Sequence, residues 1–293
     1  MKESLSVQRA LAGRHILFTG ASGFLGKVWL TMMLDKVPEV GRIYVLLRGK
    51  KNQPARARFD QMVNDSYAFS KLHELHGEAF SRFLAERVEV VPGDVSRPGL
   101  GIEPKHAERI LQKLDMVVHC AGQVDFNPEL HEAVETNLEG TIHAAEFCAR
   151  AKDAGFVQVS TCFVAGNREG RILEEVDATL SPNDTKFDVE AEYLHLKQLI
   201  AQVREDCTSP AAIEKLRAEV TENIAAKGHD PGNTALIERI MKREEKARLS
   251  ERLVDVGKDR AAELGWPNVY TFTKSMGESM LLVRFPNLRK TFF

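Results

Sequence analysis

Cysteine is scarce in this sequence, and its four copies at positions 120, 148, 162 and 207 form no C-x-x-C pair. A disulfide scaffold and a structural zinc site both require closely spaced cysteines or cysteine–histidine alternation, so the spacing argues against both. We therefore expect no bound metal, and we interpret the cysteines as reduced thiols of a cytoplasmic protein.

Long apolar runs and an excess of one charge are also missing. No stretch approaches the roughly 20 apolar residues that span a bilayer, and residues 1–15 lack the apolar core of a secretory signal. Lys+Arg 40 against Asp+Glu 42 gives a formal charge of -2, so no general basic field attracts nucleic acid or an anionic membrane. These absences predict a cytoplasmic protein with no nucleic-acid partner and no transmembrane segment. They leave peripheral membrane contact and the oligomeric state open.

What the sequence does contain is a regular alternation of short apolar runs and longer helical patterns. Such β–α alternation predicts an α/β fold with a doubly wound parallel sheet, Rossmann-like, covered by helices on both faces. The five runs cover residues 15–19, 42–47, 87–91, 115–119 and 156–160, and the helical patterns cover 24–35, 55–85, 104–113 and 128–151.

The pattern changes after residue 183. Between about 184 and 264 apolar residues recur at helical spacing among charged ones, for example Leu216, Val220 and Ile224. We predict a helical insertion, broken into two halves at 228–232, rather than a coiled coil with a partner. The predicted domains are a dinucleotide-binding domain over 1–183, the insertion over 184–264, and a final helix and strand over 265–293. The abrupt end on a strand suggests that the parent sequence continues.

A glycine-rich loop follows the first predicted strand and opens the first predicted helix. Its three glycines would permit a tight turn, close approach of a pyrophosphate, and close packing of helix on strand. The helix N-terminus would direct its free N–H groups at the anion. The predicted cofactor-binding residues of this loop are Gly20, Ser22, Gly23, Phe24, Leu25 and Gly26.

The end of the second strand indicates which dinucleotide binds. Arg48 stands where an NAD site would place an acidic residue for the ribose 2′-hydroxyl. With Lys50 and Lys51 beside it, Arg48 favours NADP, because the 2′-phosphate of that cofactor requires cationic donors.

Two further strand ends fit the same ligand, because ligands of open parallel sheets collect beyond the carboxyl ends of the strands. Asp94, followed by Val95, could accept from the adenine amino group. Small residues at the end of the fourth strand would let ribose and nicotinamide lie against the chain, namely Cys120, Ala121 and Gly122.

The predicted catalytic residues come from a strand end and a late helix. Ser160 and Thr161 end the fifth strand, while Tyr270 and Lys274 share one helix face at i, i+4 spacing. A nearby ammonium favours phenolate and thereby activates a tyrosine as a proton donor and acceptor. Lys274 could also bind ribose hydroxyls, so Tyr270 and Lys274 are predicted cofactor contacts as well.

At these residues the chain resembles the extended short-chain dehydrogenase/reductases. More narrowly, it resembles a fatty acyl-CoA reductase of their thioester-reducing branch, a resemblance that covers nearly the whole chain. The long helical segment before Tyr270 is typical of that branch. The motifs that carry the resemblance are 19–26, 45–48, 93–95, 118–122, 137–141, 159–161 and 270–274.

The resemblance implies NADPH-dependent reduction of a long-chain fatty acyl-CoA to an aldehyde or alcohol, with release of CoA. Tyr270 and Thr161 would donate hydrogen bonds to the developing oxyanion, and Lys274 would hold the nicotinamide ribose. Asn137 would support this lysine through water, or else it is a polar helix residue without a catalytic role. The family's following substrate-binding segment and C-terminal domain are missing, so the acyl pocket is expected to be incomplete.

Several alternatives stay open. The scaffold also suits a nucleotide-sugar epimerase or dehydratase, or a noncatalytic NADP-binding fragment. Cys162 is expected to fill a buried strand end rather than act as a nucleophile. Phe126 and Phe163 are expected in the core rather than along an acyl channel, and His119 and His195 are expected to be structural. The run 242–248 is expected to be a solvated helix face rather than a CoA phosphate site.

Overall fold

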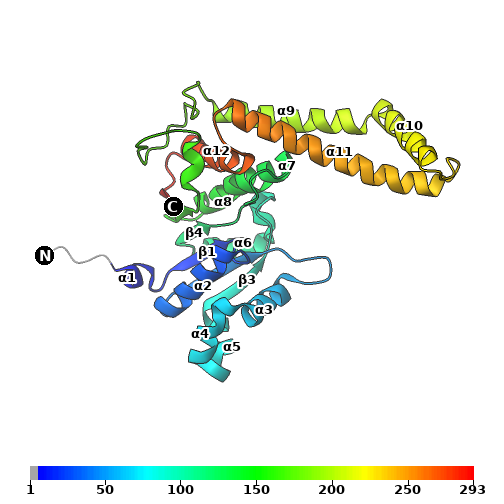
Figure 1. Ribbon diagram of the computed structural model, residues 1–293. Coiled ribbons are helices and arrows are strands. Elements are labelled where there is room, and N and C mark those ends of the chain that lie inside the picture. Colours follow the sequence, from blue (N-terminus) through cyan, green and yellow to red (C-terminus); the bar gives the residue numbers. More distant parts are fainter. Residues whose placement is uncertain (1–5) are drawn as a thin grey trace. The chain divides into compact units, whose positions relative to one another are not determined.

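The computed structural model describes residues 6–293, so the first five residues of the N-terminal stretch examined for a signal lie outside the described chain. Within it, a parallel six-stranded sheet has the order β3-β2-β1-β4-β5-β6 (Figure 1). This confirms the predicted doubly wound α/β fold. The strands are β1 (His15–Thr19), β2 (Arg42–Leu47), β3 (Val88–Pro92), β4 (Met116–His119), β5 (Gly155–Gln158) and β6 (Lys290–Phe292).

Both faces of the sheet are buried, which explains why its strands are continuous apolar runs. In β1, Ile16 and Phe18 point into a core with the helices that lie between residues 24 and 87. Leu17 lies between them in sequence and points into a second core with the helices of residues 104–111, 140–149 and 269–284. The period of two along a strand therefore divides one apolar run between two cores.

The helices of the sheet region agree with the sequence pattern except in one stretch. The expected helix over 55–85 is divided into three α-helices joined by short 3₁₀ turns, because Gly77, at φ 49°, and Ser66 end the individual segments. The helices are α2 (Phe24–Lys36), α3 (Ala55–Asp65), α4 (Ser70–His76), α5 (Phe80–Arg87), α6 (Pro104–Leu111), α7 (Leu130–Ala133), α8 (Gly140–Ala149) and α12 (Val269–Arg284). A short helix α1 (Val7–Leu11) precedes β1, and a π-helical segment (Val134–Glu139) joins α7 to α8.

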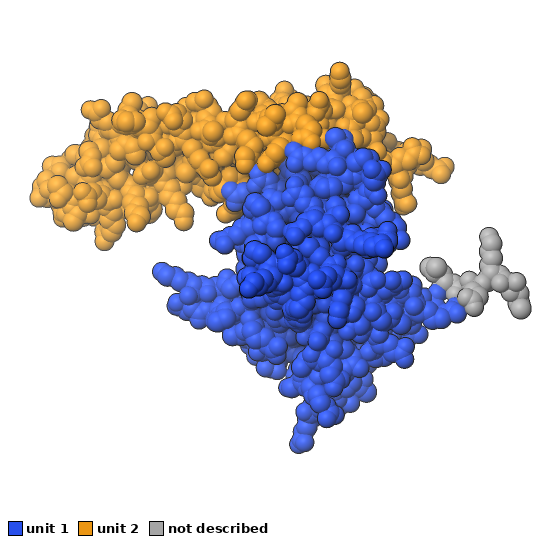
Figure 2. All heavy atoms as spheres, turned by 180° about the vertical axis from the view of Figure 1, so that it is seen from behind, with its two compact units in different colours: residues 1–123, 135–162, 274–293 blue, residues 124–134, 163–273 orange. Residues whose placement is uncertain are grey.

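The chain forms two compact units, coloured separately in Figure 2. Unit 1 contains the sheet and comprises residues 1–123, 135–162 and 274–293. Unit 2 comprises residues 124–134 and 163–273. Helix α12 begins in unit 2 and continues in unit 1.

Unit 2 is built mainly from three helices, α9 (Val189–Thr208), α10 (Pro210–Ala226) and α11 (Thr234–Glu263), with α9 and α11 lying side by side (Figure 1). The predicted break over 228–232 is confirmed, but the prediction of only two helical halves is wrong. A second break occurs at Ser209, whose hydroxyl accepts from the amide of Ala212 ahead of the helix that Pro210 starts. Serine before proline is a common helix start, so the sequence contained this signal.

Helices α10 and α11 of unit 2 share an apolar cluster. Leu216, Val220 and Ile224 of α10 pack against Ile237 and Met241 of α11. The i, i+4, i+8 spacing noted in the sequence is thus the buried stripe of an amphipathic helix. Throughout residues 6–293, each helix is either too short or too polar to cross a bilayer.

Candidate functional site

The loop between β1 and α2 has the geometry of an anion cradle. Two of its glycines leave no room for a side chain, and the third leaves open space at the start of α2. Gly20 has φ +82°, and a Cβ there would lie 2.6 Å from the Ala121 nitrogen. A Cβ on Gly26 would lie 2.1 Å from the Gly20 carbonyl oxygen. On Gly23, by contrast, the nearest atom to a Cβ would be 3.4 Å away, on the exposed side of the loop. The open space at Gly23, at the start of α2, fits a pyrophosphate.

The cradle is fastened to the neighbouring strand by the Thr19 hydroxyl. Its Oγ1 accepts from the backbone N–H of Cys120 (3.2 Å) and of Ala121 (3.1 Å). The hydroxyl proton is therefore directed to Nδ1 of His119, 2.9 Å away. Burial, and secondarily the charge of Lys274, lowers the pKa of His119 to about 3, so its ring is neutral and carries its proton on Nε2. His119 is thus a structural residue, as expected, that aligns the loops after β1 and β4.

The loop after β4 is fixed by the side-chain amide of Asn137, which lies in the π-helical segment. Asn137 Oδ1 accepts from the Gln123 N–H at 2.8 Å, and its Nδ2 donates to the Gln123 carbonyl at 3.1 Å. A Cβ on Gly122 would lie 3.1 Å from the same Oδ1. The amide therefore supports the backbone of residues 122–123 directly, and support of Lys274 through water stays a prediction.

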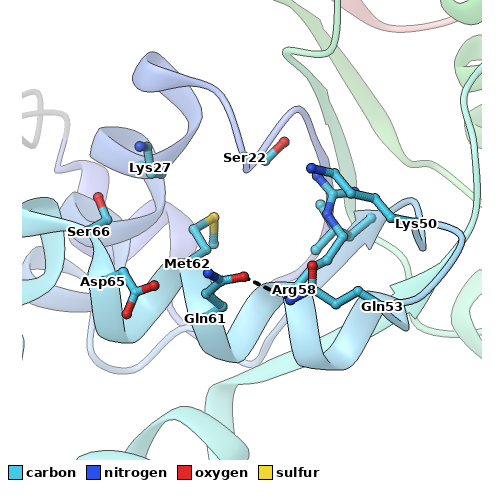
Figure 3. A pocket seen from close by; sticks show the side chains of 10 residues that line it. Ser22, Lys27, Lys50, Gln53, Arg58, Gln61, Met62, Asp65 and Ser66 are labelled. Carbon is cyan, nitrogen blue, oxygen red and sulfur yellow. Dashed lines mark hydrogen bonds between the residues drawn. The ribbon is translucent and has the colours of Figure 1, made fainter.

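A basic cavity of about 510 Å³ lies beside the cradle in unit 1. Figure 3 shows Ser22 and Lys27 on one side of it, and Gln61 and Asp65 of α3 on the other. Lys50 and Arg58 add two further cations, and the Arg58 guanidinium donates to the Arg48 carbonyl oxygen. Of the lining residues Asp65 alone is acidic. Three cations against one acid suit a phosphate group.

The two residues predicted at the second and third strand ends lie near each other. Arg48 Nη1 is 3.7 Å from Asp94 Oδ2, while Asp94 Oδ1 accepts from the amide (3.0 Å) and hydroxyl (2.9 Å) of Ser96. The carbonyl oxygen of the next residue, Val95, accepts a hydrogen bond from His143 Nδ1 at 2.9 Å. The Arg48 side chain is 69% exposed, so this ion pair is weak and leaves the guanidinium accessible to a ligand.

Lys274 is buried at the carboxyl ends of β4 and β5. It is 4% exposed, and its Nζ donates to the Val159 carbonyl oxygen at 2.6 Å. Burial lowers the pKa of Lys274 to about 8, and electrostatic interactions with Glu278 and Cys120 oppose that shift. Burial also raises the pKa of the Cys120 thiol.

Sequence reasoning missed Glu278, although its signal was present one helical turn after Lys274. Glu278 is 3% exposed in α12, and burial raises its pKa against the opposing effects of the Ser160 hydroxyl and of Lys274. Ser160 Oγ is itself buried and lies near Glu278 without a well-formed hydrogen bond in the described chain. A carboxylate, an ammonium and a hydroxyl thus share one buried region.

Tyr270 lies in the first turn of α12, where its backbone N–H donates to the Phe126 carbonyl oxygen at 3.1 Å. Tyr270 and Lys274 lie on one helix at the predicted spacing, while Thr161 follows β5 and is half-buried. That Thr161 and Tyr270 meet at one reacting carbon stays a prediction.

Three expectations about burial are wrong. Phe126 and Phe163 are 68% and 63% exposed, and Cys162 is exposed rather than filling a buried strand end. The strand pattern did not extend to them: Cys162 and Phe163 lie in a 3₁₀ turn (Cys162–Ala165), and Phe126 lies in a loop. Such irregular segments give no face periodicity from which burial could be predicted.

An NAD-binding family model described as male sterility protein matches residues 18–288. The chain is 29% identical to fatty acyl-CoA reductase 2, chloroplastic, of Arabidopsis thaliana over 96% of its own length and 41% of that protein. It is 30% identical to probable fatty acyl-CoA reductase 5 of the same plant over 94% of its length and 50% of that protein.

The chain thus spans half or less of these relatives. Among solved structures, the terminal R domain from the myxalamid PKS-NRPS biosynthetic pathway is 26% identical, with a TM-score of 0.44, over 54% of this chain and 37% of that one.

Proposed function

The chain belongs to the male sterility protein family of NAD-binding domains, and from this premise we propose that it reduces a long-chain fatty acyl-CoA with NADPH and releases CoA. The observation that carries the proposal is the joint presence of an anion cradle and a buried lysine one turn after a tyrosine. Similarity to two proteins named fatty acyl-CoA reductases supports the choice of substrate class.

For the cofactor we propose NADP rather than NAD. The pyrophosphate would bind at Gly23 and the first N–H groups of α2. The 2′-phosphate would bind in the basic cavity, where Lys27, Lys50 and Arg58 supply cations and the nearby Arg48 is accessible. Several cationic donors stabilise a bound phosphate dianion, whereas a neutral 2′-hydroxyl does not require them.

The proposed chemistry depends on Tyr270, Thr161 and Lys274. When bound, the cofactor supplies a hydride for the thioester carbonyl carbon. The Tyr270 and Thr161 hydroxyls would donate hydrogen bonds to the oxyanion that develops on the carbonyl oxygen. The C–S bond then breaks, CoA thiolate leaves, and an aldehyde remains. If that aldehyde is reduced by a second equivalent of NADPH, the proton of the new hydroxyl group would come from Tyr270.

Lys274 would act on both ligand and tyrosine. A buried ammonium on the face of α12 that carries Tyr270 stabilises a phenolate and lowers the cost of proton transfer. The same ammonium would donate to the hydroxyls of the nicotinamide ribose.

The experiment follows NADPH oxidation by the chain with palmitoyl-CoA and, in parallel, the release of free thiol. With palmitoyl-CoA we expect free thiol in an amount equal to the aldehyde and alcohol formed together, and we expect no turnover with UDP-glucose. Turnover of the sugar nucleotide without thiol release would replace the proposal by an epimerase or dehydratase. NADPH binding without any turnover would identify a noncatalytic module.

The tyrosine role is tested with Tyr270→Phe. Loss of the phenol should lower turnover at least about 100-fold, the usual contribution of a general acid, while NADPH binding is kept. Tyr67→Phe is the matched control, because the Tyr67 side chain is 92% exposed and does not line the basic cavity, so the change should leave turnover unchanged. Full activity of Tyr270→Phe would refute the assignment.

A further inference from the structure

Glu278 is a buried carboxyl group to which no role in the proposed chemistry has been given. It is 3% exposed, although burial of a carboxylate is costly unless a compensating charge or hydrogen bond is near. Position 278 lies four residues after Lys274 in α12, so both side chains leave the helix on one face, one turn apart. Lys274 is thus a cation on the same helix face, and its charge favours the ionised form of Glu278.

The groups that face Lys274 make this carboxylate its main anionic partner. From the end of β4 come His119, whose ring is neutral, and Cys120, whose thiol pKa burial raises. From the end of β5 come the Val159 carbonyl oxygen and the Ser160 hydroxyl, which are both uncharged. Among these groups Glu278 is the carboxyl group, so its ionised form is the one that opposes loss of the lysine's proton.

The contacts of the two side chains fall on successive residues of one strand end. Lys274 Nζ binds the carbonyl oxygen of Val159, and Glu278 lies beside the hydroxyl of Ser160. The next residue along the chain is Thr161. Lys274 therefore binds Val159, and Glu278 lies beside Ser160; these two residues lead directly to a predicted oxyanion donor.

We propose that Glu278 is a positioning residue that keeps the buried Lys274 side chain protonated and fixes the end of β5 ahead of Thr161. Its importance for turnover rests on the proposed function, whereas its effect on Lys274 does not. Without the carboxylate, the effect of desolvation on the ammonium would be less opposed, and the lysine would lose its proton at a lower pH.

The test measures the ionisation of Lys274 without any turnover. The ligand-free protein is treated with trace acetic anhydride at a series of pH values, and acetylation of Lys274 is quantified by peptide mass spectrometry. We expect a midpoint near the pKa of about 8 in the wild-type chain. Glu278→Gln should lower this midpoint by roughly one to two pH units, the effect of a unit charge about one helical turn away at a partly screened site.

Two controls make the outcome specific. Ser279→Ala changes a neighbouring side chain that is also 3% exposed, and it should leave the midpoint where it is. Glu278→Asp keeps the charge and should restore most of the midpoint lost in Glu278→Gln. Equal midpoints in wild type and Glu278→Gln would overturn the proposal, because Glu278 would then be protonated or remote.

A wild-type midpoint well below pH 7 would also overturn it and needs no variant, so failure of Glu278→Gln to fold leaves the test intact. If palmitoyl-CoA is turned over, Glu278→Gln should in addition move the alkaline limb of the pH–rate profile to lower pH. If the midpoint shifts but wild type turns over no acyl-CoA, the proposed function fails while the role of Glu278 stands.

Discussion

Replacement of Gly23 by alanine should separate cofactor binding from folding. Gly23 has φ −73°, which alanine adopts without strain, and the nearest atom to the new methyl group would be the Gly20 oxygen at 3.4 Å. We therefore expect the free energy of unfolding to stay within about 1 kcal/mol of wild type, with a small gain because alanine restricts the unfolded chain.

Cofactor binding should respond very differently, because the methyl group would occupy the space over the helix N-terminus. Displacing a pyrophosphate from two backbone N–H donors removes two charge-assisted hydrogen bonds, each worth about 1.5–3 kcal/mol. The expected loss of at least 3 kcal/mol corresponds to about a 100-fold rise in the Kd for NADPH. Titration calorimetry measures the Kd, and urea denaturation measures the stability.

Two glycine variants serve as references. A Cβ at Gly155 would lie no closer than 3.7 Å to its neighbours. Because Gly155 is also far in sequence from the glycine-rich loop, Gly155→Ala should leave NADPH affinity unchanged. Gly26→Ala forces a Cβ to within 2.1 Å of a backbone oxygen and should cost stability, by about 1–3 kcal/mol. Wild-type NADPH affinity in Gly23→Ala would refute the assignment of the cradle.

Three further changes test other parts of the site. Arg58→Ala should weaken NADPH about 10- to 100-fold through loss of one charge-assisted contact and leave NADH unchanged; equal losses for both cofactors would reject the 2′-phosphate assignment. Thr19→Val leaves the partly buried N–H groups of Cys120 and Ala121 without their acceptor and should lower the free energy of unfolding by about 1–2 kcal/mol in urea denaturation, whereas an unchanged midpoint would mean that the loops are aligned by other contacts. The folded-state pKa of His119, about 3, lies below its unfolded value of 6.5, so the unfolded chain binds the extra proton and stability falls as the pH drops below 6.5. Between pH 7 and pH 5 the protonation of His119 in the unfolded chain should lower the free energy of unfolding by about 2 kcal/mol. The His119→Asn protein should lack this pH dependence, and equal pH dependence of the two proteins would refute the reasoning.

The sheet and the glycine loop could be predicted because their signals are local. Each strand is an apolar run bounded by polar residues, and the glycine spacing describes one turn between one strand and one helix. The right-handedness of β–α–β connections then decides on which face of the sheet each connecting helix lies.

The remaining site features depend on contacts between segments far apart in sequence. Arg58 belongs to a helix that gave no sign of facing the Arg48 turn, and the Thr19–His119 hydrogen bond joins residues 100 positions apart. Asn137 was noticed, but its bonds to the Gln123 backbone depend on where a π-helical segment places it. Glu278 stands four residues after Lys274 in the sequence, and only its burial in the structure distinguishes it from a solvated charge on a helix.

The separate apolar cluster of α10 and α11 has a consequence for how the molecule opens. Since Leu216, Val220, Ile224, Ile237 and Met241 pack among themselves, apart from the two cores of the sheet, that end of unit 2 can lose its structure without exposing Phe18 or Phe156. Backbone amides there should exchange with solvent deuterium through partial openings of low free energy, while those of β1 and β4 should exchange only when the whole sheet unravels.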